Sequence, residues 1–89
     1  MGNPEPTFIS KNVIIEDMRP VGVESKHIKL YLGDRQSNVK FGAIAFNMGD
    51  RINEFHIGDK INIVYTLEKD DWNGNERLQL KIKDLKISN

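Results

Sequence analysis

The feature that most constrains the fold is a period-two alternation of apolar and polar residues, which recurs in separate parts of the chain. The alternating apolar positions are Ile28, Leu30 and Leu32, then Ile61, Ile63, Tyr65 and Leu67, and finally Leu78, Leu80 and Ile82. This spacing places every second side chain on one face of a strand, so each segment is predicted to be a half-buried strand. In the last segment, Asp84 shifts the phase to Leu85 and Ile87.

Two further segments complete the predicted sheet. Residues 8–21 contain the β-branched run Val13–Ile15, and Pro20 with Gly22 marks a bent or distorted strand end. The turn-forming cluster 33–38 joins residues 27–32 to residues 41–47 as a hairpin.

In the 41–47 segment we expect one particular phase of inward and outward side chains. Ile44 and Phe46 are expected to point inward and Ala43, Ala45 and Asn47 outward, while the pattern leaves the side of Phe41 open. Gly42 has the character of a bulge or of a residue that another group approaches closely.

The order of the segments predicts the fold class. A turn at 47–50 leads into a short helix with Met48, Ile52 and Phe55 on one face, and Gly58–Asp59 is a tight turn. An Asn73–Gly74 turn separates the last two strands. An all-β, five-stranded barrel with one short helix between strands 3 and 4 is the order of the OB-fold. An SH3-like barrel places its helical turn between the last two strands, so the helix position disfavours it.

Size and composition predict one small domain. The chain has 89 residues, which is enough to enclose one core but not two. We expect residues 1–7 to be a linker from a preceding domain and residues 8–89 to be the OB-fold domain. No apolar run approaches the length of a membrane span, so no membrane partner is expected. The N-terminus lacks the pattern of a signal peptide and the sequence contains no cysteine, which favours a cytoplasmic setting.

The net charge argues against a partner that is held mainly by long-range charge attraction, such as a polyanion. Thirteen Lys and Arg residues balance thirteen Asp and Glu residues, so the chain as a whole has no attraction to a polyanion. The charges are nevertheless uneven along the sequence, with lysines concentrated in the segments 26–29 and 81–86.

The sequence offers no catalytic or metal-binding motif. His27 and His56 lie on unrelated elements, and without cysteine there is no nucleophile–base pair or zinc ligand set. An OB-type nuclease would need carboxylates and an arginine on one face, but Asp34, Asp50 and Arg35 do not obviously converge. We therefore expect neither enzymatic activity nor a cofactor in this domain.

The pattern does supply aromatic faces beside cations, which single-stranded nucleic acid requires. In an OB barrel the groove runs over strands two and three and the loops joining strands one to two and four to five. His27, Lys29 and Tyr31 share an outward face, Lys26 ends the first loop, and Trp72 occupies the second. Arg77, Gln79 and Lys81 belong to the outward side of the last strand. Trp72 capping the barrel end is an equally good interpretation, and Tyr31 could be an ordinary surface tyrosine.

Several motifs, taken in order, resemble the OB domain of the RecJ family. Ser25–Leu30 is similar to the family's Gly-Lys-His-Leu-x-Leu, and Ala43–Phe46 to its Ala-Ile-Ala-Phe. Gly2–Phe8 resembles the segment leading into that domain, and Trp72–Gly74 with Leu78–Asp84 resembles its last hairpin. The chain departs from the family pattern at Ser25, often glycine, and at Asp70, often asparagine.

The resemblance implies a function for the domain. RecJ proteins are 5′-to-3′ exonucleases specific for single-stranded DNA, with their metal-binding residues in separate DHH and DHHA1 domains, so the parent nuclease would use Mg or Mn. This chain would then be an excised module that holds single-stranded DNA and guides it to the nuclease centre. Asn73, which flanks Trp72, joins the expected contact residues on this ground. The alternative is a module that braces the nuclease domains or docks on a repair partner, which an exposed apolar patch away from Lys26 would favour.

Overall fold

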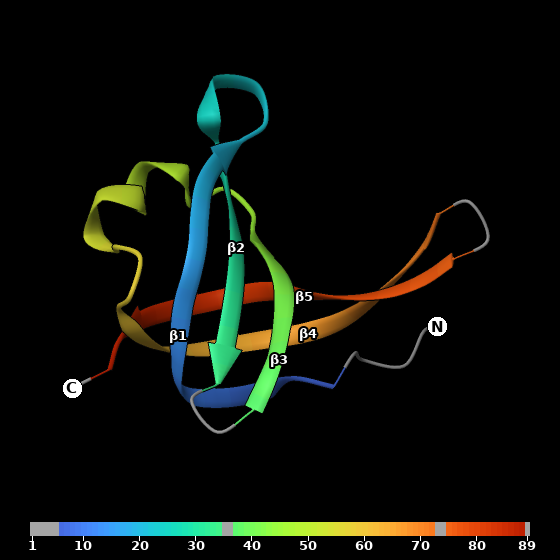
Figure 1. Cartoon of the computed structure of the whole chain (residues 1–89). Coiled ribbons are helices and arrows are strands. Elements are labelled where there is room, and N and C mark those ends of the chain that lie inside the picture. The colour runs from blue at the N-terminus through green and yellow to red at the C-terminus, as the bar shows by residue number, and fades with distance from the viewer. Residues whose placement is uncertain (1–5, 35–36, 73–74, 89) are drawn as a thin grey trace.

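A computed structural model of the chain shows a five-stranded barrel (Figure 1). It describes residues 6–34, 37–72 and 75–88, with the backbone but not the side chains of residues 37–38, 70–72 and 75–77. In chain order the elements are β1 (Phe8–Val21), the 3₁₀ turn η1 (Val23–Ser25), β2 (His27–Asp34), β3 (Ser37–Ala45), the 3₁₀ turn η2 (Gly49–Glu54), β4 (Lys60–Trp72) and β5 (Asn75–Ile87).

The barrel closes in the order β1-β2-β3-β5-β4, with η2 between β3 and β4. This is the predicted OB-fold, and the predicted order along the chain, three strands, a helical turn and two strands, is confirmed. No helix in the described part of the chain is long and apolar enough to cross a membrane.

The long strand β1 contributes to both sides of the barrel because irregularities bend it. It pairs with β4 from Phe8 to Ile14 and with β2 from Ile14 to Val21. The ladder shifts register between Ser10 and Val13, where Asn12 has φ 61°, and again between Ile15 and Asp17. Such bulges bend a strand and increase its twist, which lets one strand close a small barrel.

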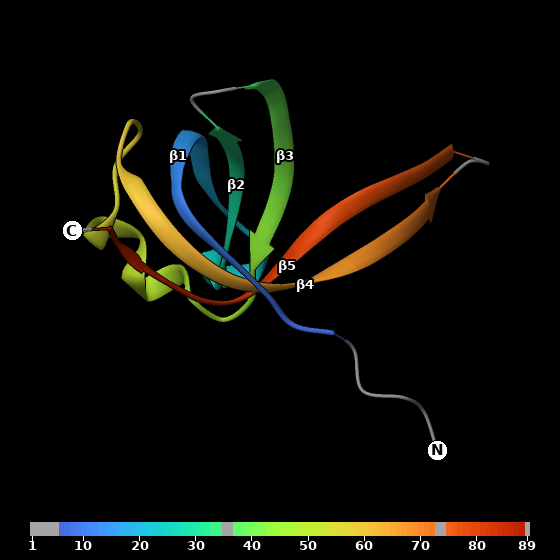
Figure 2. The same cartoon turned by 90° about the horizontal axis from the view of Figure 1, so that it is seen from below.

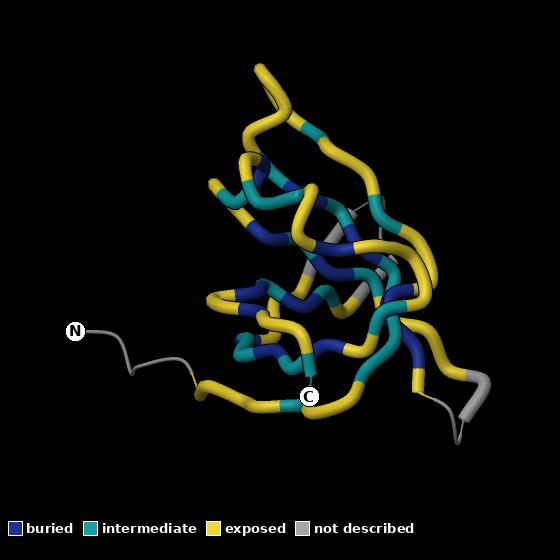
Figure 3. The backbone as a smooth tube through the Cα atoms, turned by 90° about the vertical axis from the view of Figure 1, so that its left-hand side faces the viewer, coloured by how far each residue is buried: buried dark blue, intermediate teal, exposed yellow. Residues whose placement is uncertain are grey.

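The predicted alternation produces the core. Ile28, Leu30 and Leu32 of β2 are at most 1% exposed, as are Ile61 and Ile63 of β4. They alternate with positions of intermediate burial. Figure 3 shows segments of the tube along which buried and less buried positions alternate. In β5 the register shifts opposite Val64 and Tyr65, so Ile82 and Leu85 are both buried. The predicted change of phase at Asp84 is thereby confirmed at Leu85, whereas Ile87, expected on the same face, is 40% exposed.

The predicted phase of β3 is wrong. Ala43 and Ala45 are fully buried, whereas Phe46 is 40% exposed and Ile44 is half-buried. Residues directly opposite each other in a ladder point to the same face, and Ala43 is opposite Leu30 and Leu80 while Ala45 is opposite Ile28 and Ile82. Where β3 lies between two strands with large inward side chains, only small side chains fit the barrel interior.

Gly42 forms no bulge. It pairs in regular register with Tyr31, and the shift in this ladder lies between Gly33 and Asp34 instead. The alternative prediction of a close approach is not borne out either, because a Cβ built on Gly42 would lie 3.9 Å from Tyr31 Cε1, an ordinary van der Waals distance.

One end of the barrel is closed by η2 and the residues beside it. Phe55, which directly follows η2, is 2% exposed, and Met48 and Ile52 pack against the same core. The predicted apolar face is therefore confirmed. Arg51 attaches this turn to β5, since its Nη2 donates to the carbonyl oxygen of Leu85 at 3.1 Å. A hydrogen bond with the Glu54 carboxylate raises the pKa of Arg51 above its ordinary value.

The other end of the barrel stays open because β3 and β5 diverge. Their parallel ladder consists of Ala43–Ala45 against Leu80–Ile82. Figure 2 shows the β4–β5 hairpin continuing as an arm that leans away from β3. The antiparallel ladder of this arm extends to the Trp72–Asn75 pair.

Candidate nucleic-acid interface

The outward face of β2 carries the central residues of the candidate site. His27, Lys29 and Tyr31 alternate with buried residues and are each half-buried. Lys29 Nζ lies 5.8 Å from the centroid of the Tyr31 ring, within the range of a cation–π contact. The ring of Tyr31 lies against Gly42, where no side chain holds it away from the sheet. Strand β2 therefore presents a ring and a cation side by side, as predicted.

A second aromatic group of this face, Phe46, was missed by the sequence interpretation. Its ring makes an edge contact with His27 at a centroid distance of 5.1 Å and an interplanar angle of 73°. Lys81 Nζ lies 5.7 Å from the Phe46 centroid. The reversed phase of β3 brings Phe46 out, so the same type of pairing occurs twice, as Lys29 with Tyr31 and as Lys81 with Phe46.

The backbone holds His27 in place at the end of β2. Its Nδ1 accepts a hydrogen bond from the Asn47 amide at 2.9 Å, which leaves Nε2 to carry the proton in the neutral ring. A Cβ at Gly22, which has φ +87°, would lie 2.7 Å from His27 Cδ2. The loop before β2 therefore approaches the imidazole closely, and this close approach together with the left-handed backbone requires glycine.

The loop carrying Lys26 is tied to the closed end of the barrel. The Gly49 amide donates to the Lys26 carbonyl oxygen at 2.7 Å, and a Cβ on Gly49 would lie 1.8 Å from the Ser25 carbonyl oxygen. Glu24 and Ser25 both have positive φ, 58° and 56°. Lys26 itself is exposed, so the loop presents its ammonium group to solvent beside the β2 face.

The remaining predicted residues belong to β5 and to the β4–β5 arm. Gln79 and Lys81 are half-buried and alternate with the inward Leu80 and Ile82, as predicted. The ladder places Lys81 beside Ile44 of β3. Trp72 does not lie in the loop where it was predicted, because β4 continues to this residue and Trp72 pairs with Asn75 of β5. The side chains of Trp72 and of Arg77 in β5 are outside the described residues, and so is Asn73.

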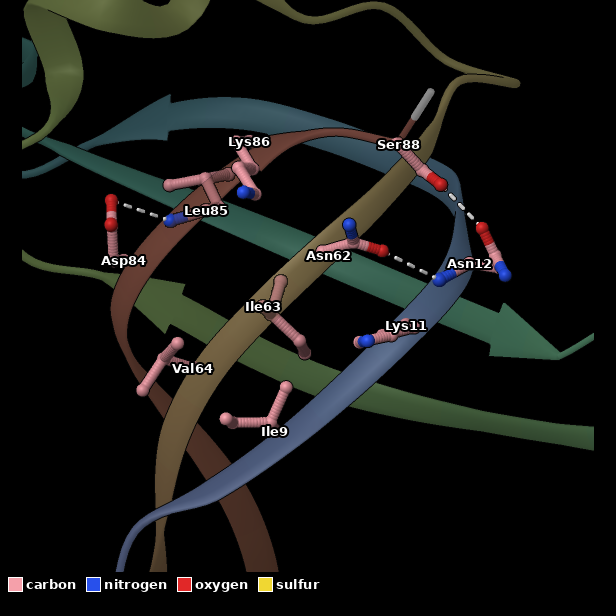
Figure 4. A pocket seen from close by; sticks show the side chains of 10 residues that line it. All are labelled: Ile9, Lys11, Asn12, Asn62, Ile63, Val64, Asp84, Leu85, Lys86 and Ser88. Carbon is pink, nitrogen blue, oxygen red and sulfur yellow. Dashed lines mark hydrogen bonds between the residues drawn. The ribbon is translucent and has the colours of Figure 1, made fainter.

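A separate hollow lies on the outside of β1, β4 and β5, away from the residues above (Figure 4). The backbone amide of Asn12 donates to Asn62 Oδ1 at 3.0 Å, and Ser88 Oγ donates to the side-chain oxygen Oδ1 of Asn12. These polar groups satisfy one another, and they attach the positive-φ bend of β1 to β4 and to the end of β5. We assign this hollow a structural role.

Chemically, the β2–β3–β5 face offers two rings for stacking and lysines for phosphate contacts. Among the described residues, no group of three His, Cys, Asp or Glu side chains could hold a metal ion. The fold and this face together define a class, an OB-fold barrel with an aromatic and cationic outer face.

Comparison with known proteins places the chain within that class. It matches the RecJ OB domain family over residues 1–84, and it belongs to this family. It is 31% identical over 88 residues to the single-stranded-DNA-specific exonuclease RecJ of Bacillus subtilis, covering 99% of this chain and 11% of that protein. The RecJ of Haemophilus influenzae is 35% identical over 81 residues, covering 91% of this chain and 14% of that protein.

One solved structure matches this fold over nearly the whole length of both chains. A mitochondrial single-stranded DNA binding protein of S. cerevisiae superimposes with a TM-score of 0.71 at 10% identity, covering 94% of this chain and 96% of that chain. The chain thus spans about one tenth to one seventh of its RecJ relatives, and almost the whole of this structural neighbour.

Proposed function

We propose that this domain binds single-stranded DNA across the outer face of β2, β3 and β5. The observation that carries the proposal is the twofold pairing of a ring with a lysine, Tyr31 with Lys29 and Phe46 with Lys81. Stacked bases need an aromatic face and adjacent phosphates need a cation, and both are present at each position. The names of the RecJ relatives and of the structural neighbour, which refer to single-stranded DNA, support the same ligand.

The individual contacts follow from the chemistry of each group. Tyr31 and Phe46 stack on bases, Lys26, Lys29 and Lys81 contact phosphates, and His27 and Gln79 provide polar contacts on the same face. From the sequence we also expect Trp72 to stack on a base, Arg77 to contact a phosphate and Asn73 to bind nearby, although these side chains lie outside the described residues. Stacking does not distinguish bases, so sequence preference is slight. The net charge of zero limits long-range attraction, so affinity is modest and the log–log salt slope changes by about 0.7 per phosphate neutralised.

The decisive experiment compares two phenylalanines of one segment, Phe41 within β3 and Phe46 directly after its end. Phe46 is 40% exposed on the candidate face, and Phe41 is 47% exposed on the opposite, inward side of β3. Fluorescence anisotropy with a labelled oligo(dT) strand should show Phe46→Ala weakening binding by about 1–3 kcal/mol, or about 5- to 150-fold. Phe41→Ala should leave the affinity unchanged. Equal losses in both variants would contradict the assignment of this face.

We further propose that the bound strand is passed to a nuclease centre elsewhere in a RecJ-like protein. If so, Phe46→Ala in the longer protein slows degradation of long single strands. The part of such a strand that lies away from the nuclease centre would then be bound less tightly by the β2–β3–β5 face, so the strand would be positioned less often for cleavage. Oligonucleotides too short to reach the groove should be degraded at the original rate. A slowdown that does not depend on substrate length would place the defect outside strand guidance.

A further inference from the structure

The open end of the barrel contains an apolar cleft that the proposed DNA-binding face does not use. Its volume is about 470 Å³. Leu32, Ile63 and Leu80 form its buried floor, and Phe41 and Leu78 form opposite walls. Leu78 is 62% exposed, Phe41 47% and Leu67 44%, although all three continue the inward-facing rows of their strands. Exposed apolar groups gathered in one cleft indicate a binding surface for another macromolecule.

The backbone beside this cleft is suited to an extended chain. Lys40 and Phe41 pair with β2, but they lie before the β3–β5 ladder, which begins at Ala43 and Leu80. In an antiparallel pair, alternate residues turn their N–H and C=O groups away from the partner strand. One of these two residues therefore directs its N–H and C=O toward the gap between β3 and the arm (Figure 2). An added strand would bond there by β-augmentation, with its apolar side chains in the cleft.

The lining of the cleft distinguishes this ligand from nucleic acid. Its described lining is mostly apolar, and Lys11 and Asp34 are its charged members, one of each sign. A polyanion gains nothing from a pair of opposite charges, whereas an extended peptide with alternating apolar side chains satisfies both the walls and the strand edge.

We propose that the open end takes up an extended apolar segment from the remainder of a longer polypeptide that contains this domain. The chain covers 11% and 14% of its RecJ relatives, so such proteins have ample sequence outside this domain. Phe8 stacks on Tyr65 at 5.8 Å, and Ser10 Oγ lies 2.9 Å from Tyr65 Oη at the rim of the cleft. Because Phe8 and Ser10 contact Tyr65 at this rim, a polypeptide joined ahead of them is tethered close to the cleft, which gives its segments a high effective concentration there.

Hydrogen exchange tests this proposal by comparing the 89-residue chain with the longer polypeptide. In the short chain, whichever of the Lys40 and Phe41 amides faces the gap should exchange quickly. In the longer polypeptide, strand pairing should slow that exchange by about tenfold or more. Equally fast exchange in both would overturn the proposal. Protection that grows with the concentration of the short chain alone would also overturn it, because a second copy would then be the occupant.

Matched substitutions make the result specific. Leu78→Asp places a charge on the apolar wall and should restore fast exchange at Lys40–Phe41 in the longer polypeptide. Phe46→Ala, on the other face, should leave the protection intact. Leu78→Asp should also leave the affinity of the short chain for oligo(dT) unchanged, so that failure of the cleft proposal and failure of the DNA-binding proposal give different results. Circular dichroism of each variant checks that the barrel is folded.

Discussion

The two ends of this barrel are lined by the same kinds of residue but differ in what covers them. At the closed end, Phe55 is 2% exposed beneath η2, and it completes the core. At the open end, Phe41 is 47% exposed in a similarly apolar setting with no element of the described chain above it. The difference teaches that inward alternation alone does not make a core, because burial also requires an element that closes the barrel. Side chains at the closed end stabilise the fold, and those at the open end are available for binding.

The largest expected effect comes from Phe55→Ala at the closed end. Removing a fully buried ring should lower the free energy of unfolding by about 3–5 kcal/mol, because a cavity replaces the core packing. Phe41→Ala, which removes an equal but half-exposed ring, should cost about 1 kcal/mol. Urea unfolding followed by circular dichroism measures both. Similar costs would show that the two ends are equally important to stability.

Alanine substitutions of a glycine at each end should also differ in their effect on the free energy of unfolding, but by less than the two phenylalanine variants. In Gly49→Ala the new Cβ would meet backbone atoms of Ser25 and Lys26, so a cost of about 1–3 kcal/mol is expected. Gly33 lines the open cleft, and there a Cβ meets the end of the exposed Glu16 side chain, which can move aside. Gly33→Ala should therefore stay within about 0.5 kcal/mol. Thermal unfolding of the two variants provides the comparison, and the reverse ranking would contradict the close packing at Gly49.

Arg51→Ala should lower the free energy of unfolding by about 1 kcal/mol, because it removes the hydrogen bond that links η2 to the Leu85 carbonyl. The Arg51–Glu54 ion pair, at 3.3 Å, is solvent-exposed on the Glu54 side and contributes about 0.3–0.5 kcal/mol. Glu54→Ala should thus cost less than Arg51→Ala in chemical denaturation. If the two variants cost the same, the bond to β5 does not secure the closed end.

A similarly small stability effect is expected for Leu78→Thr at the open end. Leu78 is 62% exposed and threonine retains strand propensity, so the unfolding free energy should change by about 0.5 kcal/mol or less. The apolar wall is nevertheless lost, so native-state binding of the dye ANS should decrease. Unchanged dye fluorescence would show that the cleft is not an accessible apolar surface.

The candidate site was predictable where one strand sufficed to define a face. His27, Lys29 and Tyr31 alternate with three large aliphatic residues, so their outward direction follows from β2 alone. Phe46 was not predictable in this way, because the segment Phe41–Phe46 contains apolar residues on both faces. The large inward residues of β2 were the available signal, since they require small partners such as Ala43 and Ala45.

By itself, the sequence determined the order of the strands and the helical turn along the chain, and the change of phase at Asp84. These features depend on local periodicity and turn chemistry, which act over a few neighbouring residues. Tertiary structure alone decided which face β3 buries and which end of the barrel remains open. Both depend on pairing between strands that are distant in sequence, and Ala43 is placed inside only because Leu30 on one side and Leu80 on the other already occupy the interior.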